Sequence, residues 1–299
     1  MRRPLFAFLF SLLWLLASTA SAASATERGA LFKVSLDGHE MHLFGTLHVG
    51  LPEFYPLEPR IAEALGQAST LALEFDPAQP QRELLRAVRE HGMLDPGAAG
   101  YDAMDAQQRA LLDKLIEQGR LDASRAMTFK PMLLATLLTL AEYTKQGYRT
   151  DLSSEAWLVR QARAQGARVL ELESLDRQLS LLDRLAEPDR WRFLDEMMAA
   201  IVSGAQRREA RNMVQAWSSA DREALDAIAA RCELDASVSG SFVTRVLLKE
   251  RNADLAGSLL ELLRQEPRTF AAVGVLHLLG SESVPQLLQE KGVQVERIY

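Results

Sequence analysis

The sequence predicts an α/β fold in which a mixed central sheet is flanked by helices and carries a largely helical insertion. Three observations lead to this prediction. Short β-prone apolar runs alternate with helical patterns, as expected of strands joined by helical crossovers. Two long stretches, about 82–150 and 175–265, are mainly helical in pattern. No fixed repeat period indicates a solenoid.

Residues 1–22 have the features of a secretory signal peptide, and the remainder, 23–299, is expected to form one domain. Two arginines precede an apolar run, and small residues offer a cleavage site after Ala22 or, alternatively, after Ala25. The apolar run is shorter than the roughly 20 residues that span a bilayer, although an uncleaved anchor is the alternative interpretation. No later segment resembles a transmembrane helix. We therefore expect a periplasmic or secreted protein.

The mature chain is acidic and contains a single cysteine. The whole chain has a formal net charge of −6, and removing Arg2 and Arg3 with the leader makes it about −8. Nucleic-acid binding rests on clustered positive charge, which this chain lacks, so we expect no nucleic-acid partner. Cys232 has no second cysteine with which to form an internal disulfide. Stability must therefore come from a hydrophobic core.

The first expected elements are a hairpin and a crossover. Two apolar runs flank Asp37-Gly38-His39, a sequence typical of a hairpin turn. Pro56 and Pro59 then introduce a helix, and the next apolar run contains Glu74. Strict alternation along that run would leave Glu74 exposed, whereas a buried carboxylate would need a partner. The expected elements are strands at 31–36, 40–44 and 71–75, and a helix that ends near 67.

Strand and helix patterns alternate again in the second half of the chain. Gly166 ends a helix, and the buried strand predicted after it ends in the acidic Glu171-Leu172-Glu173. Gly292 precedes the last strand. The expected elements are helices at 154–165, 252–265 and 284–289, and strands at 167–172, 270–275 and 293–298.

The pattern Gly-x-x-His occurs after two of the predicted strands. Gly45-Thr46-Leu47-His48 follows the second strand, and Gly274-Val275-Leu276-His277 ends the strand near the other end of the chain. Open α/β sheets place their ligands at the carboxyl edge of the strands. Neutral imidazole is the commonest metal-ligating side chain. The two histidines therefore predict one site, with hydrogen bonding of each in its loop as the structural alternative.

Other polar residues have weaker claims to a function. His39 and His42 lie three apart on a predicted hairpin, so they would face opposite sides of the sheet. His91, beside Gly92, is most simply a partner for the end of a helix. Cys232 lies on a predicted helix, where a catalytic role is not expected. Arg251 and Asn252 lie in a helical turn and could anchor a substrate carboxylate or carbonyl.

The chain resembles the TraB/PrgY/GumN family, which is related to the Tiki proteases and more distantly to the erythromycin esterase and ChaN-like group. The resemblance covers nearly the whole mature chain. Two features depart from it: Val275-Leu276 replaces small residues and is expected to narrow the pocket, and Asp151 is separated from Gly147, which makes it a minor candidate. The resemblance rests on the segments 43–50 (LFGTLHVG), 73–74 (LE), 169–174 (VLELES) with Gln178, 250–252 (ERN) and 272–280 (AVGVLHLLG).

The resemblance implies a divalent-metal site, because in the Tiki relatives the two GxxH histidines and a glutamate are regarded as metal ligands for peptide hydrolysis. This assignment carries onto His48, His277 and Glu74, with Mn, Co or Zn as the ion. Metal binding would lower the pKa of a bound water towards neutrality. Glu173 is then the candidate general base, and Arg251 would stabilise the oxyanion or, with Asn252, bind the substrate.

The leading hypothesis is therefore an exported, metal-dependent hydrolase of peptide or ester bonds with a peptide or small-molecule substrate. If Glu74 were the base, a third metal ligand would be unidentified. A second hypothesis is metal-free, with His48 as general base and Glu74 fixing its tautomer, as the esterase relatives suggest. A third is a non-catalytic protein that binds haem or a peptide, because the ChaN-like relatives bind haem.

Overall fold

The computed structural model describes residues 26–95, 100–266 and 268–299, so the expected leader at 1–22 lies outside the described residues. Within them, no helix combines the length and the apolar character needed to cross a membrane.

The strands are β1 (Leu31–Leu36), β2 (His39–Thr46), β3 (Thr70–Leu73), β4 (Arg168–Glu171), β5 (Arg268–Gly274) and β6 (Gln294–Arg297). The α-helices are α1 (Pro59–Gln67), α2 (Gln81–Ala87), α3 (Ala106–Gln118), α4 (Ala123–Ala126), α5 (Pro131–Lys145), α6 (Ser154–Ala164), α7 (Leu175–Ser180), α8 (Glu187–Val202), α9 (Ala205–Ser218), α10 (Arg222–Leu234), α11 (Val238–Phe242), α12 (Arg251–Gln265) and α13 (Val284–Glu290). Two π-helical segments are η2 (Val88–Gly92) and η6 (Val243–Glu250), and the 3-10 turns are η1 (Pro52–Phe54), η3 (Gly100–Ala103), η4 (Thr150–Leu152), η5 (Leu181–Arg184) and η7 (Val275–Leu278).

The six strands form one mixed sheet in the order β4-β3-β5-β2-β1-β6. The first four strands of this order are parallel to one another, and β1 pairs antiparallel with both β2 and β6. The predicted α/β fold with a mixed sheet is therefore confirmed. Since parallel strands end on the same side, β4, β3, β5 and β2 share one carboxyl edge.

The hairpin between β1 and β2 has a two-residue turn. Asp37 and Gly38 have φ values of 51° and 85°, and Leu36 pairs with His39. Positive φ at both central positions is the geometry of a type I′ turn, for which Asp-Gly is a favoured sequence. His39 therefore begins β2, and our expectation that it is a turn residue is wrong.

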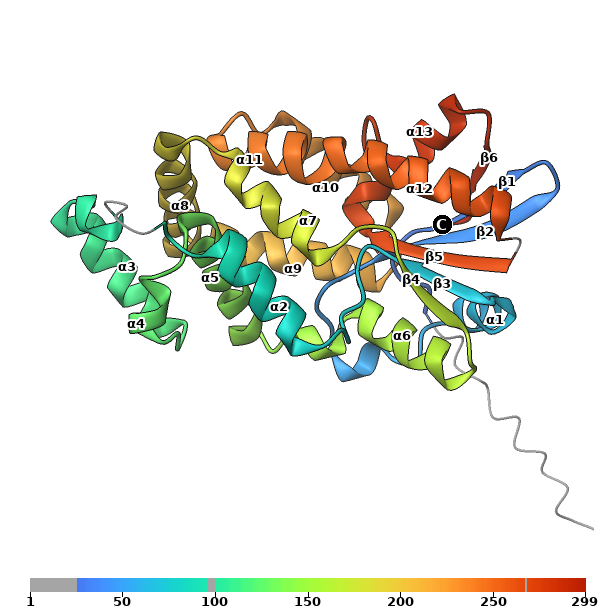
Figure 1. Ribbon diagram of the computed structural model, residues 1–299, viewed down its shortest axis with the longest axis horizontal. Helices are drawn as coiled ribbons and strands as arrows, with labels where there is room; N and C mark the ends of the chain where they lie inside the picture. Colours follow the sequence, from blue (N-terminus) through green and yellow to red (C-terminus); the bar gives the residue numbers. More distant parts are fainter. Residues whose placement is uncertain (1–25, 96–99, 267) are drawn as a thin grey trace, which may run out of the picture.

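Helices cover both faces of the sheet (Figure 1). Helices α1 and α6 contact β3, β4 and β5 on one face, and α12 contacts β1, β2 and β5 on the other. Phe44 and Phe270 are fully buried between these layers, and each contributes about 1.5–3 kcal/mol relative to an exposed side chain.

Position in the sheet determines the burial of the strands. All four residues of β3 are buried because it lies between β4 and β5. Strand β4 is at the edge, with Arg168 and Glu171 exposed, so the prediction of a buried strand at 167–172 is wrong in this respect. The central position of β3 also contradicts the alternating pattern that would have exposed Glu74, which is buried directly after the strand.

A second apolar cluster lies away from the sheet, at the other end of the long axis (Figure 1). It is built from α3, α5, α8 and α11, with Leu134, Leu194 and Phe242 among its buried members. These helices belong to the two stretches predicted to be mainly helical. Helix α5 links this cluster to the site, because Thr136 and Leu140 line the cleft described below.

Candidate active site

The carboxyl edge of the sheet brings four predicted residues together. Glu74 directly follows β3, and Glu173 follows β4 by two residues. His48 follows β2 by two residues, and His277 lies in η7 after β5. Because the four strands are parallel neighbours, residues separated by up to 229 positions reach one place.

The two GxxH segments interlock through their glycines. Thr46 pairs with Gly274 across β2 and β5. A Cβ on Gly45 would lie 2.9 Å from Cγ2 of Val275. A Cβ on Gly274 would lie 3.2 Å from Glu74 Oε1, 3.4 Å from His48 Nε2 and 3.6 Å from His277 Cδ2. Gly45 thus permits close packing, whereas Gly274 leaves a gap between the polar groups.

His48 has a carboxylate partner that sequence reasoning missed. Its Nδ1 lies 2.6 Å from Oε1 of Glu155, in the first turn of α6. The hydroxyl of Ser154 accepts a hydrogen bond from the N–H of Leu47 at 2.8 Å and donates to its carbonyl at 3.2 Å. These bonds attach the N-terminus of α6 to the first GxxH segment. Glu155, rather than Glu74, is therefore placed to set the tautomer and charge of His48.

His48 is accessible from the cleft, and its side chain is 64% exposed. The charge of Glu155 raises the pKa of His48 to about 9, although partial enclosure by the protein opposes this. Burial raises the pKa of Glu155, but the charge of His48 and hydrogen bonds outweigh it, so the net shift is downwards. The pair is an imidazolium and a carboxylate at neutral pH, and Nε2 of His48 faces the gap beside Gly274.

Arg251 organises the buried side of the site. Its Nε and Nη2 donate to Glu173, and Nη2 also donates to Glu74. Its Nη1 donates to the carbonyl of Leu247 at 3.1 Å and to Nε2 of His277 at 3.2 Å. Every one of the five guanidinium N–H groups therefore has a partner within the protein. Arg251 is a positioning residue in this arrangement, with no donor left for a substrate.

The hydrogen bonds of His277 define its tautomer. Asn252 donates through Nδ2 to the carbonyl of Glu282 at 2.8 Å, so its Oδ1 faces His277 Nδ1, 2.6 Å away. Nδ1 must then carry the proton, and Nε2 must accept from Arg251. His277 is neutral, and both of its ring nitrogens are occupied.

The pKa values of the buried groups agree with this arrangement. Burial lowers the pKa of His277 to about 4, although Glu74 acts in the opposite direction. Burial raises the pKa of Glu74, but the neighbouring His277, Arg251 and His48 and the Gly274 N–H together lower it to about 2. That N–H donates to Glu74 Oε1 at 2.6 Å. Glu74 is therefore ionised at neutral pH.

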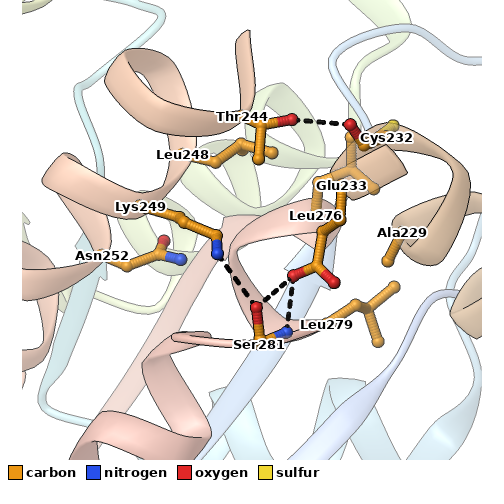
Figure 2. Close-up of a pocket in the computed structure, with 10 residues that line it drawn as sticks. All are labelled: Ala229, Cys232, Glu233, Thr244, Leu248, Lys249, Asn252, Leu276, Leu279 and Ser281. Atoms are coloured by element: carbon orange, nitrogen blue, oxygen red, sulfur yellow. Dashed lines mark hydrogen bonds between the residues drawn. The ribbon is translucent and has the colours of Figure 1, made fainter. Parts of the chain in front are cut away.

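Behind Asn252, a polar network holds the loop that follows η7 (Figure 2). Glu233 accepts hydrogen bonds from the N–H and the hydroxyl of Ser281, at 2.7 and 2.6 Å. Lys249 donates to Ser281 at 3.0 Å and to Glu282 at 2.8 Å. The small cavity there has a volume of only about 10 Å³, too little for a substrate. The role of the polar network is structural, because it fixes the loop whose Glu282 carbonyl orients Asn252.

A cleft of about 380 Å³ opens in front of the site. This volume is within the range of small-molecule sites. The lining combines charged residues at the floor with largely apolar walls. The lining residues are His48, Glu74, Phe75, Pro77, Thr136, Leu140, Thr150, Ser153, Glu155, Gln178 and Ala272.

The arrangement does not offer one ion three free donors. A metal site needs lone pairs from about three protein side chains, and His48 Nε2 faces the gap beside Gly274. However, Nε2 of His277 accepts from Arg251, and both oxygens of Glu74 accept hydrogen bonds. Arg251 would have to release His277 before His48, His277 and Glu74 could share an ion. The predicted metal site stays a prediction.

Several other candidates lie outside the cleft lining. Asp151 is exposed and paired with Arg149. Cys232 and Leu276 line the small cavity instead, and Val275 packs against Gly45. Neither Val275 nor Leu276 is among the residues that line the cleft, and the expected narrowing beside His277 stays a prediction.

The remaining histidines have separate environments. His39 Nδ1 lies 2.9 Å from the carbonyl of Leu263, and His42 stacks on Phe270. His91 lies at the end of a helical segment, as expected, but it also meets Asp176 and Asp183.

Comparison with known proteins identifies the family. The model of the TraB/PrgY/gumN family matches residues 30–297. The chain belongs to this family. It is also similar to the uncharacterized protein YbaP of Escherichia coli (strain K12) and to its Shigella flexneri counterpart. Each is 26% identical over 268 residues, which cover 86% of this chain and 90% of the relative. No solved structure gives a significant match.

In this member of the TraB/PrgY/gumN family, Glu155 is the residue of the site whose role the sequence indicates least. An acid in the first helical turn is ordinarily explained by the helix dipole. No spacing connects it with His48, 107 residues earlier. Gln178 is indicated in the sequence by the family resemblance alone, and its amide donates to Glu74 at 3.3 Å and to Glu173 at 3.1 Å.

Proposed function

We propose that the protein is a hydrolase of peptide or ester bonds in which the His48–Glu155 pair transfers the proton. The observation that carries this proposal is the position of His48: Nδ1 contacts a buried carboxylate, and Nε2 faces a gap in a substrate-sized cleft. A base whose second ring nitrogen is held by a carboxylate is a recurring arrangement for activating water. The leader expected at 1–22 supports action outside the inner membrane.

In the proposed reaction, neutral His48 accepts a proton from water through Nε2. The water oxygen forms a bond to the carbonyl carbon, and the carbonyl π electrons move to its oxygen. Collapse of this tetrahedral intermediate breaks the bond to the leaving nitrogen or oxygen, which receives the proton from His48. The carboxylate of Glu155 stabilises the imidazolium between these two transfers.

The buried residues support this reaction by fixing the arrangement of charged groups beside the cleft. Arg251 holds Glu74 and Glu173 and keeps His277 in one tautomer. Glu173 is less suited to be a general base than predicted, because it accepts hydrogen bonds from both Arg251 and Gln178. Two positive groups, Arg251 and protonated His48, face three carboxylates in the site, so its net charge is negative and it favours neutral or cationic substrates over anionic ones. The carboxylates are those of Glu74, Glu155 and Glu173.

A metal-dependent version of the same hydrolase is the second candidate. It is favoured by the convergence of Glu74 Oε1, His48 Nε2 and the His277 ring around Gly274. An ion there would supply a bound hydroxide and polarise the carbonyl. The engaged nitrogens of His277 favour the metal-free reaction over it.

Activity measurements on protein treated with EDTA test the proposal. Esters and peptides with neutral groups beside the scissile bond should be cleaved without added Mn²⁺, Co²⁺ or Zn²⁺. Activity that disappears with EDTA and returns with one of these ions would support the metal-dependent candidate. Absence of cleavage with and without the ions, across both substrate classes, would contradict the proposed function.

The pH profile of kcat/KM tests the role of Glu155. A base acts in its deprotonated form, so the rate should rise with pH and level off above the pKa of His48, about 9. In Glu155→Gln the midpoint should fall by about 1–3 pH units, because an adjacent opposite charge is lost. A midpoint that does not move would exclude Glu155 as the partner that sets the charge of the base.

A further inference from the structure

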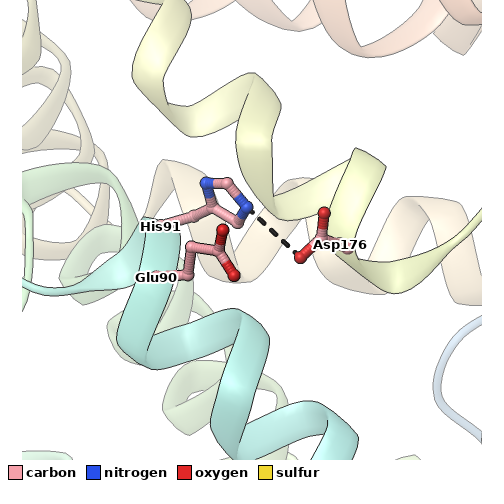
Figure 3. Close-up of side chains that lie close together, drawn as sticks. All are labelled: Glu90, His91 and Asp176. Carbon is pink, nitrogen blue, oxygen red and sulfur yellow. Dashed lines mark ion pairs between the residues drawn. The ribbon is translucent and has the colours of Figure 1, made fainter.

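We propose that Glu90, His91 and Asp176 form a binding site for a divalent transition-metal ion such as Zn²⁺ or Co²⁺, separate from the catalytic cleft. One donor atom from each lies within 4.8 Å of the others. Glu90 and His91 belong to η2, and Asp176 belongs to α7, so the ligands come from segments more than 80 residues apart. Figure 3 shows the three side chains converging between these two helical segments.

The separation of two of the donors suits a shared ion. Nε2 of His91 lies 3.4 Å from Oδ1 of Asp176. Two ligands that are each about 2.1 Å from a tetrahedral ion lie about 3.4 Å apart. That contact with Asp176 does not have hydrogen-bond geometry, and among the described residues the buried Nε2 atom of His91 has no other hydrogen-bond partner. A buried nitrogen without a hydrogen bond is costly, and an ion would satisfy it.

The other ring nitrogen of His91 is held as in known metal sites. Its Nδ1 lies 3.3 Å from Oδ2 of Asp183. Nζ of Lys130, a nearly fully buried side chain, contacts the second oxygen of Asp183. Metal-ligating histidines commonly donate their second N–H to a carboxylate, which fixes the tautomer. If Nδ1 donates to Asp183, Nε2 keeps a lone pair that is available to an ion beside Asp176.

The ligand set indicates the kind of ion. One imidazole nitrogen and two carboxylate oxygens suit Zn²⁺ or Co²⁺, whereas Ca²⁺ and Mg²⁺ prefer oxygen ligands alone. Glu90, Asp176 and Asp183 bring three negative charges near one positive charge on Lys130. A divalent ion would neutralise the excess. Glu90 is exposed, so its side chain is free to adjust to the ion.

The site would stabilise the part of the fold that carries Gln178. Helix α7 contacts both α2 and η2. Gln178 is two residues after Asp176 along the chain and donates to Glu74 and Glu173 in the cleft. An ion between η2 and α7 would therefore fix the position of α7, and with it the contacts of Gln178 with Glu74 and Glu173, without contacting the substrate.

Calorimetric titration of EDTA-treated protein with Zn²⁺ tests the site. The wild type should bind one equivalent, and His91→Ala and Asp176→Asn should lose it. In Asp183→Asn, which removes the carboxylate that His91 Nδ1 and Lys130 both contact but leaves the three proposed ligands in place, the affinity should fall about 10–100-fold. His91→Ala and Asp176→Asn should lose the increase in Tm that Zn²⁺ gives the wild type, and Asp183→Asn should show a smaller increase, because the ion stabilises only the folded state to which it binds.

Matched variants separate this site from the catalytic one. Glu83→Gln, which removes a carboxylate from α2, should bind Zn²⁺ as the wild type does, and so should His48→Ala. Binding that disappears in His48→Ala or His277→Ala but survives His91→Ala would overturn the proposal, as would an absence of Zn²⁺ binding in the wild type. If circular dichroism shows that His91→Ala is unfolded, Glu90→Gln decides: unchanged affinity overturns the proposal, and weakened affinity supports it.

Discussion

The two GxxH segments have the same sequence pattern but give their histidines opposite environments. The side chain of His48 is 64% exposed, and that of His277 is 4% exposed. A carboxylate raises the pKa of His48 to about 9, whereas burial lowers that of His277 to about 4. His48 retains a nitrogen that faces the cleft, and His277 retains none. Equivalent positions in a motif are therefore not equivalent in chemistry.

The glycines of the two segments differ in the same way. Gly45 allows β2 to approach Val275, which is a packing role. Gly274 keeps open the space among Glu74, His48 and His277, which is a role in the site. The first segment thus contributes the exposed reactive group, and the second contributes the gap and the buried support.

The largest expected effect separates the histidines by activity. In His48→Gln, kcat/KM should fall about 10²–10⁴-fold because the general base is removed. The free energy of unfolding should fall by about 1–3 kcal/mol, because the buried carboxylate of Glu155 loses its cationic partner. His42→Gln, on the strand that precedes His48, is the matched control and should retain activity. Full activity in His48→Gln would contradict the proposed difference.

The second expected effect concerns the support of His277. Arg251→Gln leaves Glu74 and Glu173 buried without their cation, so the free energy of unfolding should fall by about 3–5 kcal/mol. Urea denaturation measures this change. Arg245→Gln removes an exposed guanidinium from the preceding η6 and should have little effect. Equal stability of the two variants would show that the network does not support the second segment.

The dependence of stability on pH should distinguish the histidines by sign. For His277 the folded pKa, about 4, lies below the unfolded value near 6.5, so the unfolded state binds more protons between these values. Stability should therefore fall as the pH is lowered, by about 2 kcal/mol from pH 7 to pH 5. For His48 the folded pKa is raised, so its contribution is present below pH 6.5 and is lost as the pH rises through about 9.

Denaturation curves of two variants check this expectation. In His277→Gln, the free energy of unfolding should depend less on pH between pH 6.5 and 4.5. Glu74 loses its contribution to stability only at lower pH than this window. His48→Gln should flatten it only between pH 6.5 and 9. If both variants altered the same window, the assigned environments would be incorrect.

The smallest expected effect compares the glycines. Gly45→Ala places a methyl group 2.9 Å from Val275, so it should lower the free energy of unfolding by about 1 kcal/mol or more. Gly274→Ala fills the gap at contacts of 3.2–3.6 Å and should lower kcat/KM about tenfold by displacing the polar groups. Thermal denaturation and activity assays on both variants measure the two effects. A loss of activity in Gly45→Ala alone would reverse the assignment.

Sequence patterns predicted the mixed sheet and its shared edge because apolar runs and turn residues are local signals. They could not predict that β4 lies at the edge, since strand order depends on contacts between distant segments. Glu74 shows the same limit. Its position after an apolar run was visible, but its burial depends on β3 lying between β4 and β5.

The amino-acid sequence by itself determined which strand ends carry polar residues, because Gly-x-x-His and the acidic strand ends are contiguous patterns. Only the tertiary structure decided which groups are partners. The pairing of Glu155 with His48 and the bonds of Arg251 and Asn252 to His277 join segments 25–107 residues apart. Such contacts set the charge and accessibility of each histidine through burial and neighbouring charges, which depend on distance in space rather than on position along the chain.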